Sequence, residues 1–440
     1  MRELSGWGRY PRAECRVIAG RGEAELRAVL AQNDSLIARG NGRSYGDSAL
    51  NPAATLAMCH DDRLLDFDPA TGRLTAEAGV MLADVIATFL PRGFFPPVTP
   101  GTKFVTLGGM IAADVHGKNH HRAGSFGDHV ESLDLMLAGG GVVTCSASSN
   151  RDLFDATRGG MGLTGIILRA TFRLIPVETA YIRQETLRAR DLDETMELFE
   201  RSRDWTYSVA WIDCLARNGG LGRSLLMRGE HAAAAELPDS RRATPFAVPA
   251  KGEKRVPLDL PACALNRWSV RAFNGVYYRR AGTGVALVDY DRFFYPLDAI
   301  LDWNRLYGRQ GLVQYQCVIP KDRSRAGLTA LLERIARAGA GSFLSVLKLL
   351  GPGRGMLSFP LEGYTLALDF PASSASLDLL RELDAIVAAH GGRVYLAKDA
   401  RLEAEALRHF YPGLEAFLSA RKAADPAGRF ASLQSRRLAL

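Results

Sequence analysis

The stretch Ala38-Arg-Gly-Asn-Gly-Arg-Ser-Tyr-Gly-Asp-Ser48 decides how this sequence is interpreted. Gly40, Gly42 and Gly46 have no Cβ, so they permit positive φ angles and let backbone N–H groups approach a ligand closely. Consecutive free N–H groups form a concave site for an anion such as a pyrophosphate. The glycine spacing fits neither G-x-G-x-x-G nor G-x-x-x-x-G-K-S/T. The loop therefore indicates an anion site of another kind, with an ordinary surface turn as the alternative.

Two further glycine-rich segments follow in the first half of the chain. Pro100-Gly-Thr102 leads into Thr106-Leu-Gly-Gly-Met-Ile-Ala-Ala-Asp-Val-His-Gly-Lys-Asn-His-His121, and Gly159-Gly-Met-Gly-Leu-Thr-Gly165 precedes a strand-like run. Glycine loses more conformational freedom on folding than any other residue, so three such loops are costly unless a ligand needs them. Together they favour a large dinucleotide that lies across several loops.

Four histidines, His116, His120, His121 and His129, suggest a metal site at first sight. Zinc sites need three or four ligands and are usually supported by Cys or carboxylates. Here the neighbours include cationic residues such as Lys118, and no cysteine pair has C-x-x-C spacing. We therefore expect no metal and interpret these histidines as polar pocket or surface residues.

Length and composition set the remaining limits. The chain has 440 residues, 47% of them hydrophobic and 23% charged, which predicts a globular protein of two domains. Its six cysteines are scattered singly, which favours reduced thiols and a cytoplasmic protein. The first residues do not form a signal peptide, and no apolar run is long enough to span a membrane. The net charge of +7 suits an anionic substrate or membrane face, and without a nucleic-acid-binding motif we expect no nucleic-acid partner.

The order of predicted elements is that of an α+β protein, because strand-like and helix-like segments alternate irregularly. Strands are expected at residues 74–80 and 165–177, the second of them central, and two more are expected across a glycine turn within residues 133–145. Helices are expected at residues 82–90, 191–203, 325–338 and 377–390. Residues 239–261 are basic and rich in proline and predict a mobile loop.

At this point the sequence resembles a known family. The glycine segments are similar to the FAD domain of the vanillyl-alcohol oxidase superfamily, of para-cresol methylhydroxylase (PCMH) type. The most specific similarity is to the decaprenylphosphoryl-β-D-ribose 2′-oxidases, the flavin subunits of the epimerase that makes the arabinose donor of mycobacterial walls. It runs from about residue 38 to the C-terminus and rests on the stretches ARGNGRSYGD, GGMIAADVHGKNHHRAGSFGDHV, GLTGIILRAT, FYPLDAILDWNRLYG, VQYQCVIP, SFLSVLKLLGPG, GGRVYLAKDAR and DPAGRFASLQSRRL.

The resemblance implies a two-domain PCMH-type fold. Residues 1–180 would form the N-terminal part of the FAD-binding domain, residues 181–390 a substrate or cap domain built on a mixed sheet, and residues 391–440 a segment that returns to the FAD domain. The residues implied to bind FAD are Ala38, Arg39, Gly40, Asn41, Gly42, Arg43, Ser44, Tyr45, Gly46, Asp47, Ser48, Gly101, Thr106, Leu107, Gly108, Gly109, Ala113, Asp114, Val115, His116, Ile167 and Tyr395. Those implied to bind substrate are Lys118, Gln314, Gln316, Lys348, Thr365 and Ala367.

Lys398, in the VYLAKD stretch, falls where the family has its active-site lysine, and Tyr45 and His116 are further catalytic candidates. A lysine near a flavin can stabilise an alkoxide or, when desolvated, act as a base. Without the resemblance, a solvated loop lysine would be the better interpretation. We expect noncovalent FAD, because Arg43 stands where related oxidases tether flavin through a His, and no Cys occurs in the GKNHH segment.

The implied reaction is oxidation of the 2′-hydroxyl of a polyprenylphosphoryl pentose, ribose to the 2-keto sugar, in arabinan and cell-wall biosynthesis. A separate short-chain ketoreductase would complete the epimerisation, since this chain has no nicotinamide fingerprint. Two positions depart from the mycobacterial pattern: Thr365 and Ala367 replace an Asn and a Cys, so the exact sugar stays open. Strand residues alternate in direction, so Cys317 should point away from the pocket if Gln316 lines it.

Two other functions stay open. One is an alditol or aldonolactone oxidase of the same superfamily that uses oxygen, and the other is a non-catalytic flavin scaffold in a membrane biosynthetic complex. Peripheral contact with the inner membrane is a further expectation, because a polyprenyl tail stays in the bilayer. The basic residues proposed for that contact are Arg241, Arg242, Lys251, Lys254 and Arg255, with a solvated loop as the alternative.

Overall fold

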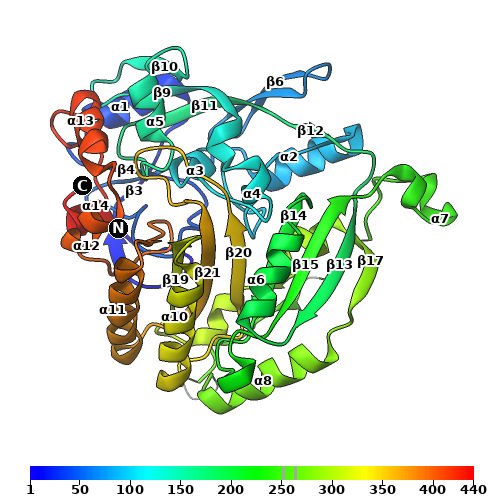
Figure 1. The fold of residues 1–440 in the computed structure, drawn as a ribbon. Helices are drawn as coiled ribbons and strands as arrows, with labels where there is room; N and C mark the ends of the chain where they lie inside the picture. The colour runs from blue at the N-terminus through cyan, green and yellow to red at the C-terminus, as the bar shows by residue number, and fades with distance from the viewer. Residues whose placement is uncertain (250–251, 253, 262–264) are drawn as a thin grey trace.

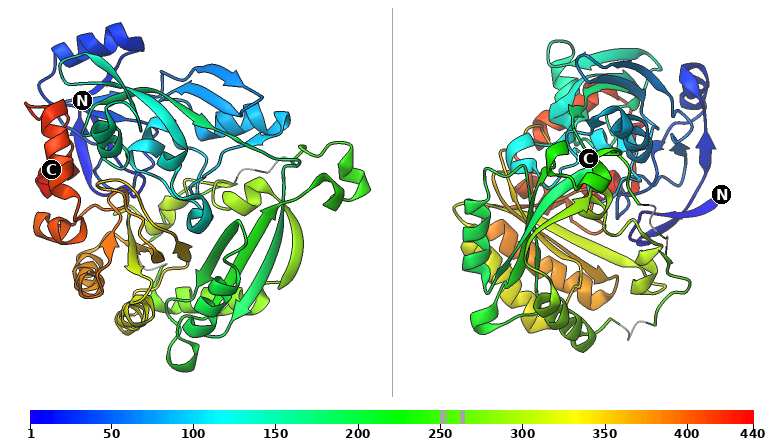
Figure 2. Two further views of the ribbon diagram at one scale, coloured as in Figure 1. Left: turned by 45° about the horizontal axis from the view of Figure 1, so that its top comes forward. Right: turned by 90° about the vertical axis from the view of Figure 1, so that its right-hand side faces the viewer.

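Two β-sheet systems of different construction organise the chain (Figure 1). The computed structural model describes residues 1–249, 252, 254–261 and 265–440. In Figure 1 the blue and cyan elements of the first half lie above the green and gold sheet of the second half, and the red C-terminal helices lie beside the first group. The turned views of Figure 2 keep the same arrangement. The fold is α+β, as the sequence predicts.

The first half contains a small parallel sheet and a five-stranded antiparallel one. The parallel sheet has the order β3-β5-β4, with β3 (Val17–Ala19), β4 (Ile37–Arg39) and β5 (Thr55–Ala57). The antiparallel sheet has the order β10-β9-β11-β7-β6, with β6 (Leu64–Asp68), β7 (Arg73–Glu77), β9 (Val130–Met136), β10 (Val142–Ser146) and β11 (Ile166–Arg173). The predicted central strand is confirmed, because β11 is the middle member.

The helix predicted at residues 82–90 is confirmed in this half. α2 (Leu82–Phe89) continues as one short turn through Pro91 and stops at Gly93, which has a φ of 82°. The other helices here are α1 (Gly22–Ala31), α3 (Leu107–Ala112), α4 (His120–Ala123) and α5 (Arg151–Thr157). Two small ribbons complete the region, β1 (Arg2–Ser5) with β2 (Arg12–Cys15) and β8 (Phe94–Phe95) with β12 (Ile175–Pro176).

The second half is built on an eight-stranded sheet in the order β17-β13-β15-β14-β20-β21-β19-β22. Its strands are β13 (Tyr181–Ala189), β14 (Tyr207–Ile212), β15 (Ser224–His231), β17 (Gly284–Asp289), β19 (Leu312–Pro320), β20 (Ser345–Leu350), β21 (Gly363–Pro371) and β22 (Arg393–Val394). Its helices are α6 (Leu192–Arg201), α8 (Arg267–Arg280), α9 (Tyr290–Phe294), α10 (Ser324–Ala338) and α11 (Ser374–Ala389). The helices predicted at residues 191–203, 325–338 and 377–390 are confirmed as α6, α10 and α11.

The predicted mixed sheet is wrong in one respect: every pairing between the described strands of this sheet is antiparallel. The cause is insertion of a third strand between strands that a helix connects. β19 and β20, joined through α10, both run antiparallel to β21, which lies between them. β15 separates β13 from β14 in the same way, after α6. Each crossover therefore joins strands of equal direction that never pair with each other.

The two faces of this sheet have different roles. α6, α10 and α11 cover one face, in front of the sheet in Figure 1, and bury a core that includes Cys317, Leu347 and Leu366. Alternate residues of the same strands, such as Gln316 and Ala367, face a cavity instead. The prediction that Cys317 points away from the side lined by Gln316 is confirmed.

The C-terminal segment closes against the beginning of the chain. It contains α12 (Ala404–Phe410), α13 (Leu414–Ala424) and α14 (Leu433–Leu438). Phe430 forms an isolated parallel β-bridge with Leu36. Arg437 forms ion pairs with Asp47 at 2.8 Å and with Asp399 at 2.9 Å. The division at residues 180 and 390 remains a prediction; β22 still belongs to the eight-stranded sheet, and the chain turns to the N-terminal half after it.

The basic segment at residues 239–261 contains two short elements, α7 (Asp239–Arg242) and β16 (Lys254–Arg255), and β16 pairs with β18 (Ile300–Leu301). Lys251 lies outside the described residues. The two elements lie apart, since Figure 1 shows α7 at the outer edge beyond β17. Across the described ranges, no helix reaches both the length and the apolar character of a membrane span.

Candidate active site

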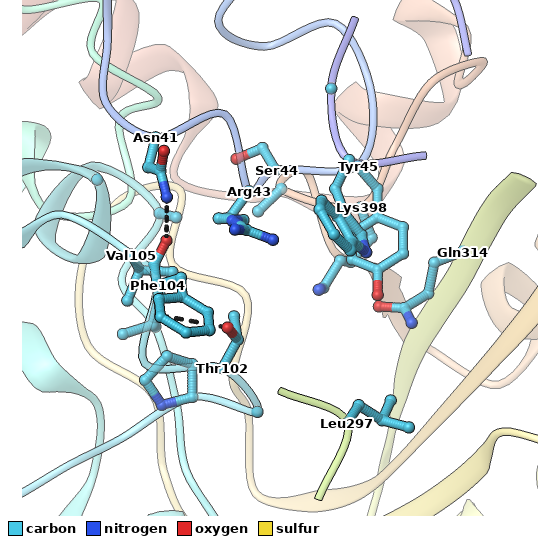
Figure 3. A pocket seen from close by; sticks show the side chains of 18 of the residues that line it. Asn41, Arg43, Ser44, Tyr45, Thr102, Phe104, Val105, Leu297, Gln314 and Lys398 are labelled. Carbon is cyan, nitrogen blue, oxygen red and sulfur yellow. Dashed lines mark hydrogen bonds between the residues drawn. The ribbon is translucent and has the colours of Figure 1, made fainter. Parts of the chain in front are cut away.

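A cavity of about 830 Å³ lies between the glycine segments and the open face of the eight-stranded sheet. The first loop, the segments at residues 99–118 and 161–167, and strands β14, β19, β20 and β21 all contribute to its wall. Figure 3 shows Asn41 and Phe104 near one end and Tyr45, Lys398 and Gln314 clustered at the other. The cavity therefore has a backbone-rich end and an end of converging side chains.

The first loop lines the cavity with its backbone. Gly42 has a φ of 64°, whereas Gly40 and Gly46 do not adopt positive φ, so that part of the prediction is wrong. They are glycines for a different reason: a Cβ on Gly40 would collide with Thr106, and one on Gly46 with the carbonyl oxygen of Asp399. A close contact therefore requires glycine at these positions, with the Thr106 side chain at Gly40 and with the backbone of Asp399 at Gly46.

The N–H groups of residues 41–44 donate to no acceptor within the described part of the chain. The Asn41 side chain fastens the loop by donating to the carbonyl of Phe104 at 2.9 Å. The second glycine segment differs, since the N–H of Leu107 donates to Val80 and that of Gly108 to Ala78. An anion-binding set of free amides therefore belongs to the first loop.

The loop that carries Lys398 is held directly against the first loop. The N–H of Tyr45 donates to the carbonyl of Ala397 at 3.0 Å, and the Lys398 Nζ lies 4.1 Å from the centre of the Tyr45 ring. Gln434 donates to the carbonyl of Leu396 at 2.7 Å from the C-terminal segment. Residues far apart in the sequence therefore fix the position of one lysine.

Asp369 on β21 completes the cluster at this end. Gln314 donates from Nε2 to Asp369 Oδ1 at 2.6 Å and is hydrogen bonded to the Tyr45 hydroxyl. Asp369 Oδ2 is buried and has no partner among the described residues. Sequence reasoning missed Asp369; strand alternation with Ala367 in YTLALDFP is the signal that points to it.

Burial sets the charges of this cluster. It lowers the pKa of Lys398 to about 7, against the opposing attraction of Asp369, and it raises the pKa of Asp369 to about 7. Burial also lowers the pKa of Lys118 to about 7 and that of Lys348 to about 8. The cavity thus holds three lysines that exchange protons near neutral pH, which is a mark of a functional site.

His116 lies at the junction of the two ends. Its Nε2 is 2.9 Å from Gln316 Nε2, so the amide donates and the ring accepts. Burial holds the pKa of His116 well below its usual range, and Nδ1 has no partner within the described residues. The ring packs beside Tyr395 at 5.3 Å, and the Tyr395 hydroxyl donates to the carbonyl of Ala113 at 2.6 Å. His116 is therefore a neutral donor free to meet a ligand.

The structure brings most of the predicted site residues to this cavity. Four of them do not line it. Leu107 is part of the core beneath α3, Asp47 is clamped by Arg437, and Asp114 binds Ser358 and the N–H of Gly127. Thr365 lies on the same face of β21 as Ala367 and accepts a hydrogen bond from Gln316 at 3.2 Å. The remaining predicted residues line the cavity: Ala38 to Gly46, Ser48, Gly101, Thr106, Gly108, Gly109, Ala113, Val115, His116, Lys118, Ile167, Gln314, Gln316, Lys348, Ala367, Tyr395 and Lys398.

Comparison with known proteins agrees with this geometry. A family model described as FAD binding domain matches residues 17–146, and one described as D-arabinono-1,4-lactone oxidase matches residues 366–438. The chain is similar to decaprenylphosphoryl-beta-D-ribose oxidase of Mycolicibacterium smegmatis, at 39% identity over 450 residues, 100% of this chain and 98% of that protein. An uncharacterized protein in the mprA 5′ region of Streptomyces coelicolor is 39% identical over 367 residues, 80% of this chain and 97% of that protein. L-gulonolactone oxidase of Mus musculus is 34% identical over 158 residues, 34% of this chain and 35% of that protein.

These matches and the cavity define the class of protein: the chain is an FAD-dependent oxidoreductase of PCMH type that acts on CH–OH groups. Within that class it belongs to the family of decaprenylphosphoryl-β-D-ribose oxidases, because the identity spans nearly the whole of both chains. The resemblance stated from the sequence is confirmed, as is FAD as the cofactor.

The residues present fit FAD. The unpaired amides of residues 41–44, beside the Arg43 guanidinium, suit a pyrophosphate. The unpaired Nδ1 of His116 and the cavity face of Ile167 suit a flat polar ring system. Arg43 itself lies 4.2 Å over the Trp7 ring, and among the described cysteines none lines the cavity. Noncovalent attachment remains a prediction that this arrangement supports.

Proposed function

We propose that this protein oxidises the 2′-hydroxyl of a polyprenylphosphoryl pentose, most simply ribose, to a ketone. Full-length similarity to the M. smegmatis oxidase supports the substrate class. The observation that carries the proposal is the cluster of Lys398, Asp369, Gln314 and Tyr45 at the side-chain end of the cavity. Such a cluster offers a base with a pKa near the working pH, which general base catalysis needs.

Lys398 takes the hydroxyl proton in this mechanism. When bound, FAD supplies the acceptor for the hydride that leaves the carbinol carbon. With a pKa of about 7, the Lys398 amine is neutral in a large share of molecules at neutral pH and accepts a proton at Nζ. Once protonated, Nζ sits over the Tyr45 ring and near the Asp369 carboxylate, both of which favour the cation.

Asp369, Gln314 and Tyr45 act as positioning residues. The Asp369 carboxylate raises the pKa of Lys398 against burial, and Gln314 holds that carboxylate with a 2.6 Å hydrogen bond. Burial keeps the pKa of Tyr45 well above its ordinary value, so its hydroxyl stays neutral and connects to Gln314. The three residues therefore fix the position of Lys398 and set its pKa.

Lys118 and Lys348 provide the charge for the sugar phosphate. Lys118 is fixed to the wall by a hydrogen bond to the carbonyl of Phe293 and lies 4.3 Å over that ring, and Lys348 projects from β20. Burial lowers the pKa of both, and an anionic phosphate nearby reverses that effect. Substrate binding should therefore be accompanied by proton uptake.

Anaerobic reduction of the bound flavin tests the proposal. Polyprenylphosphoryl ribose should bleach the flavin absorbance rapidly, and analogues that differ in one hydroxyl or lack the phosphate should bleach it slowly. The alternative, an oxygen-using aldonolactone or alditol oxidase, is favoured by the family match at residues 366–438. Rapid bleaching by free lactones or alditols, with no response to the lipid-linked sugar, would establish that alternative.

Two partners complete the proposal. A separate short-chain ketoreductase reduces the ketone from the other face, so that the pair inverts one hydroxyl. Purified oxidase alone should stop at the ketone, and formation of the epimer by this chain alone would contradict that division. The second partner is the membrane, since a polyprenyl tail remains in the bilayer and the enzyme must reach its surface.

A further inference from the structure

Helix α8 exposes an apolar stripe beside the cavity. Trp268 is 64% exposed, Phe273 47%, Val276 53% and Tyr277 41%. Phe273, Val276 and Tyr277 are three and four positions apart and share one helix face. Trp268 lies eight positions before Val276, on the same exposed half of the helix. The residues that α8 buries are few and mostly small: Val270, Asn274 and Gly275. An apolar surface of this kind on a described helix marks an interaction site.

The stripe is continuous with the cavity. Phe273 and Tyr277 both line the cavity as well as the exterior. Tyr277 packs edge-on against Trp211 with ring centres 4.8 Å apart, and Phe273 packs against Phe343 at 5.9 Å. Trp211 and Phe343 belong to the cavity wall too. A connected run of aromatic rings therefore leads from the inner wall to the surface of α8.

The charge of α8 is entirely positive. Its sequence RWSVRAFNGVYYRR contains four arginines and no acidic residue. The exposed guanidinium groups of Arg271, Arg279 and Arg280 form no ion pair within the described ranges of the chain. A helix with an exposed apolar stripe flanked by unpaired arginines has the composition of a helix that lies in the interface of an anionic bilayer.

We propose that α8 docks on an anionic membrane surface, with its apolar stripe in the interface and its arginines at lipid phosphates. The mouth of the cavity then opens onto the bilayer, and the aromatic run receives the lipid tail while the sugar phosphate enters. This inference rests on the proposed function, because a lipid-borne substrate is what requires the enzyme to meet a bilayer. A membrane fits better than a protein partner, since the stripe leads into the substrate cavity.

The basic segment at residues 239–261 suits this role less well. Arg242 pairs with Asp239 at 2.8 Å, and Arg241 lies 4.9 Å over the Tyr181 ring. Arg255 pairs with Asp302 at 3.5 Å. These arginines already have partners in the protein, whereas those of α8 are available to lipid.

Vesicle co-sedimentation of the FAD-loaded protein tests the docking surface. The vesicles contain equal parts phosphatidylcholine and phosphatidylglycerol, or phosphatidylcholine alone. Two double variants test the surface: Trp268→Ser with Val276→Ser, and Arg271→Gln with Arg279→Gln. Each should weaken binding to anionic vesicles about tenfold or more, because each lost basic or apolar contact removes part of the binding free energy. Matched controls are Leu64→Ser with Leu65→Ser, exposed on β6, and Arg354→Gln with Arg408→Gln, and these should bind as the wild type does.

A second readout separates docking from chemistry. Trp268→Ser with Val276→Ser should reduce its flavin at the wild-type rate when the substrate is dispersed in detergent, and slowly when the substrate is in vesicles. Loss of vesicle binding in these variants, with no flavin reduction by any lipid-linked sugar even in the wild type, supports the docking surface and refutes the proposed function. The docking proposal is overturned if the wild type does not bind anionic vesicles, if the α8 variants bind as tightly as the controls, or if α8 variants change only self-association in sedimentation velocity.

Discussion

The two ends of the cavity differ in the groups that line them, backbone at one end and side chains at the other. At the end formed by the first loop, the surface consists of the backbone amides of residues 41–44 and of Gly40 and Gly46, which lie against Thr106 and Asp399. At the other end, side chains from β19, β21 and the loop at residues 395–398 converge on Lys398. We infer that the main chain of the first loop holds the cofactor and that the side chains of the other end direct the reaction. Substitutions at the two ends should therefore separate binding of FAD from its reduction.

The largest effect is expected for Lys398→Met. The change keeps length and removes the charge and the proton acceptor, so anaerobic flavin reduction by substrate should slow ~100-fold or more. FAD content should remain that of the wild type, because Lys398 lies at the side-chain end. Stopped-flow absorbance measures the rate, and Lys422→Met on the exposed face of α13 is the matched control. A normal reduction rate would show that another residue is the base, and His116 would then be the next candidate.

Asp369→Asn should have the second-largest effect on flavin reduction. Removing the carboxylate removes the attraction that raises the pKa of Lys398, so that pKa falls below about 7. Reduction requires the neutral amine, so the rise of the rate with pH should move to lower pH, while the maximal rate falls roughly tenfold because the ammonium product is less stabilised. Asp34→Asn, an exposed carboxylate, is the control. An unchanged pH profile would show that Asp369 does not act through Lys398.

Gly42→Ala tests the backbone end. Gly42 has a φ of 64°, which costs a residue with a Cβ about 1 kcal/mol or more, and the added methyl would also press on Arg39. FAD affinity, measured by fluorescence of released flavin, should fall roughly tenfold. Gly219→Ala, in open space, should leave it unchanged.

FAD should be released completely on acid precipitation, because the resemblance puts Arg43 where related oxidases have a tethering His, and none of the described cysteines lines the cavity. Yellow supernatant with colourless pellet is the expected result. Flavin that stays with the denatured chain contradicts it.

The smallest effect on activity is expected for Ala367→Cys. Ala367 lines the cavity, and Cys317 faces the core on the other side of the sheet, where burial raises its pKa to about 12. A thiol that captures an electrophile must be a thiolate within reach. Nitroaromatics reduced by the flavin should therefore leave the mass of the wild type unchanged and add covalently to the variant. Mass spectrometry that found an adduct on the unmodified protein would contradict this assignment.

The backbone end was the more predictable from sequence, because glycine spacing and the resemblance both mark the loops. Even so, the prediction of positive φ is correct for Gly42 alone. Gly40 and Gly46 are close to Thr106 and Asp399, and no local sequence pattern indicates these contacts. Helices and the central strand β11 followed from periodicity and capping signals. The antiparallel sheet did not, since strand insertion depends on pairing between distant segments.

The side-chain end was predicted through motifs and remained incomplete. Asp369 was missed because its role depends on the register that places Gln314 opposite it on β19. Thr365 was placed on the pocket wall, but it does not line the cavity, and its hydroxyl accepts a hydrogen bond from Gln316. Helix α8 and its exposed stripe were not predicted, and a sequence pattern alone does not show whether an apolar helix face is buried or exposed.

The most direct test of this account measures FAD affinity and the anaerobic rate of flavin reduction in the same two variants. Lys398→Met should keep wild-type FAD affinity and lose the reduction rate. Gly42→Ala should lose affinity and, when saturated with FAD, reduce it at nearly the wild-type rate. If both variants lost both properties in parallel, or if Lys398→Met lost FAD while Gly42→Ala did not, the division of the cavity into a backbone end that holds FAD and a side-chain end that directs the reaction would be wrong.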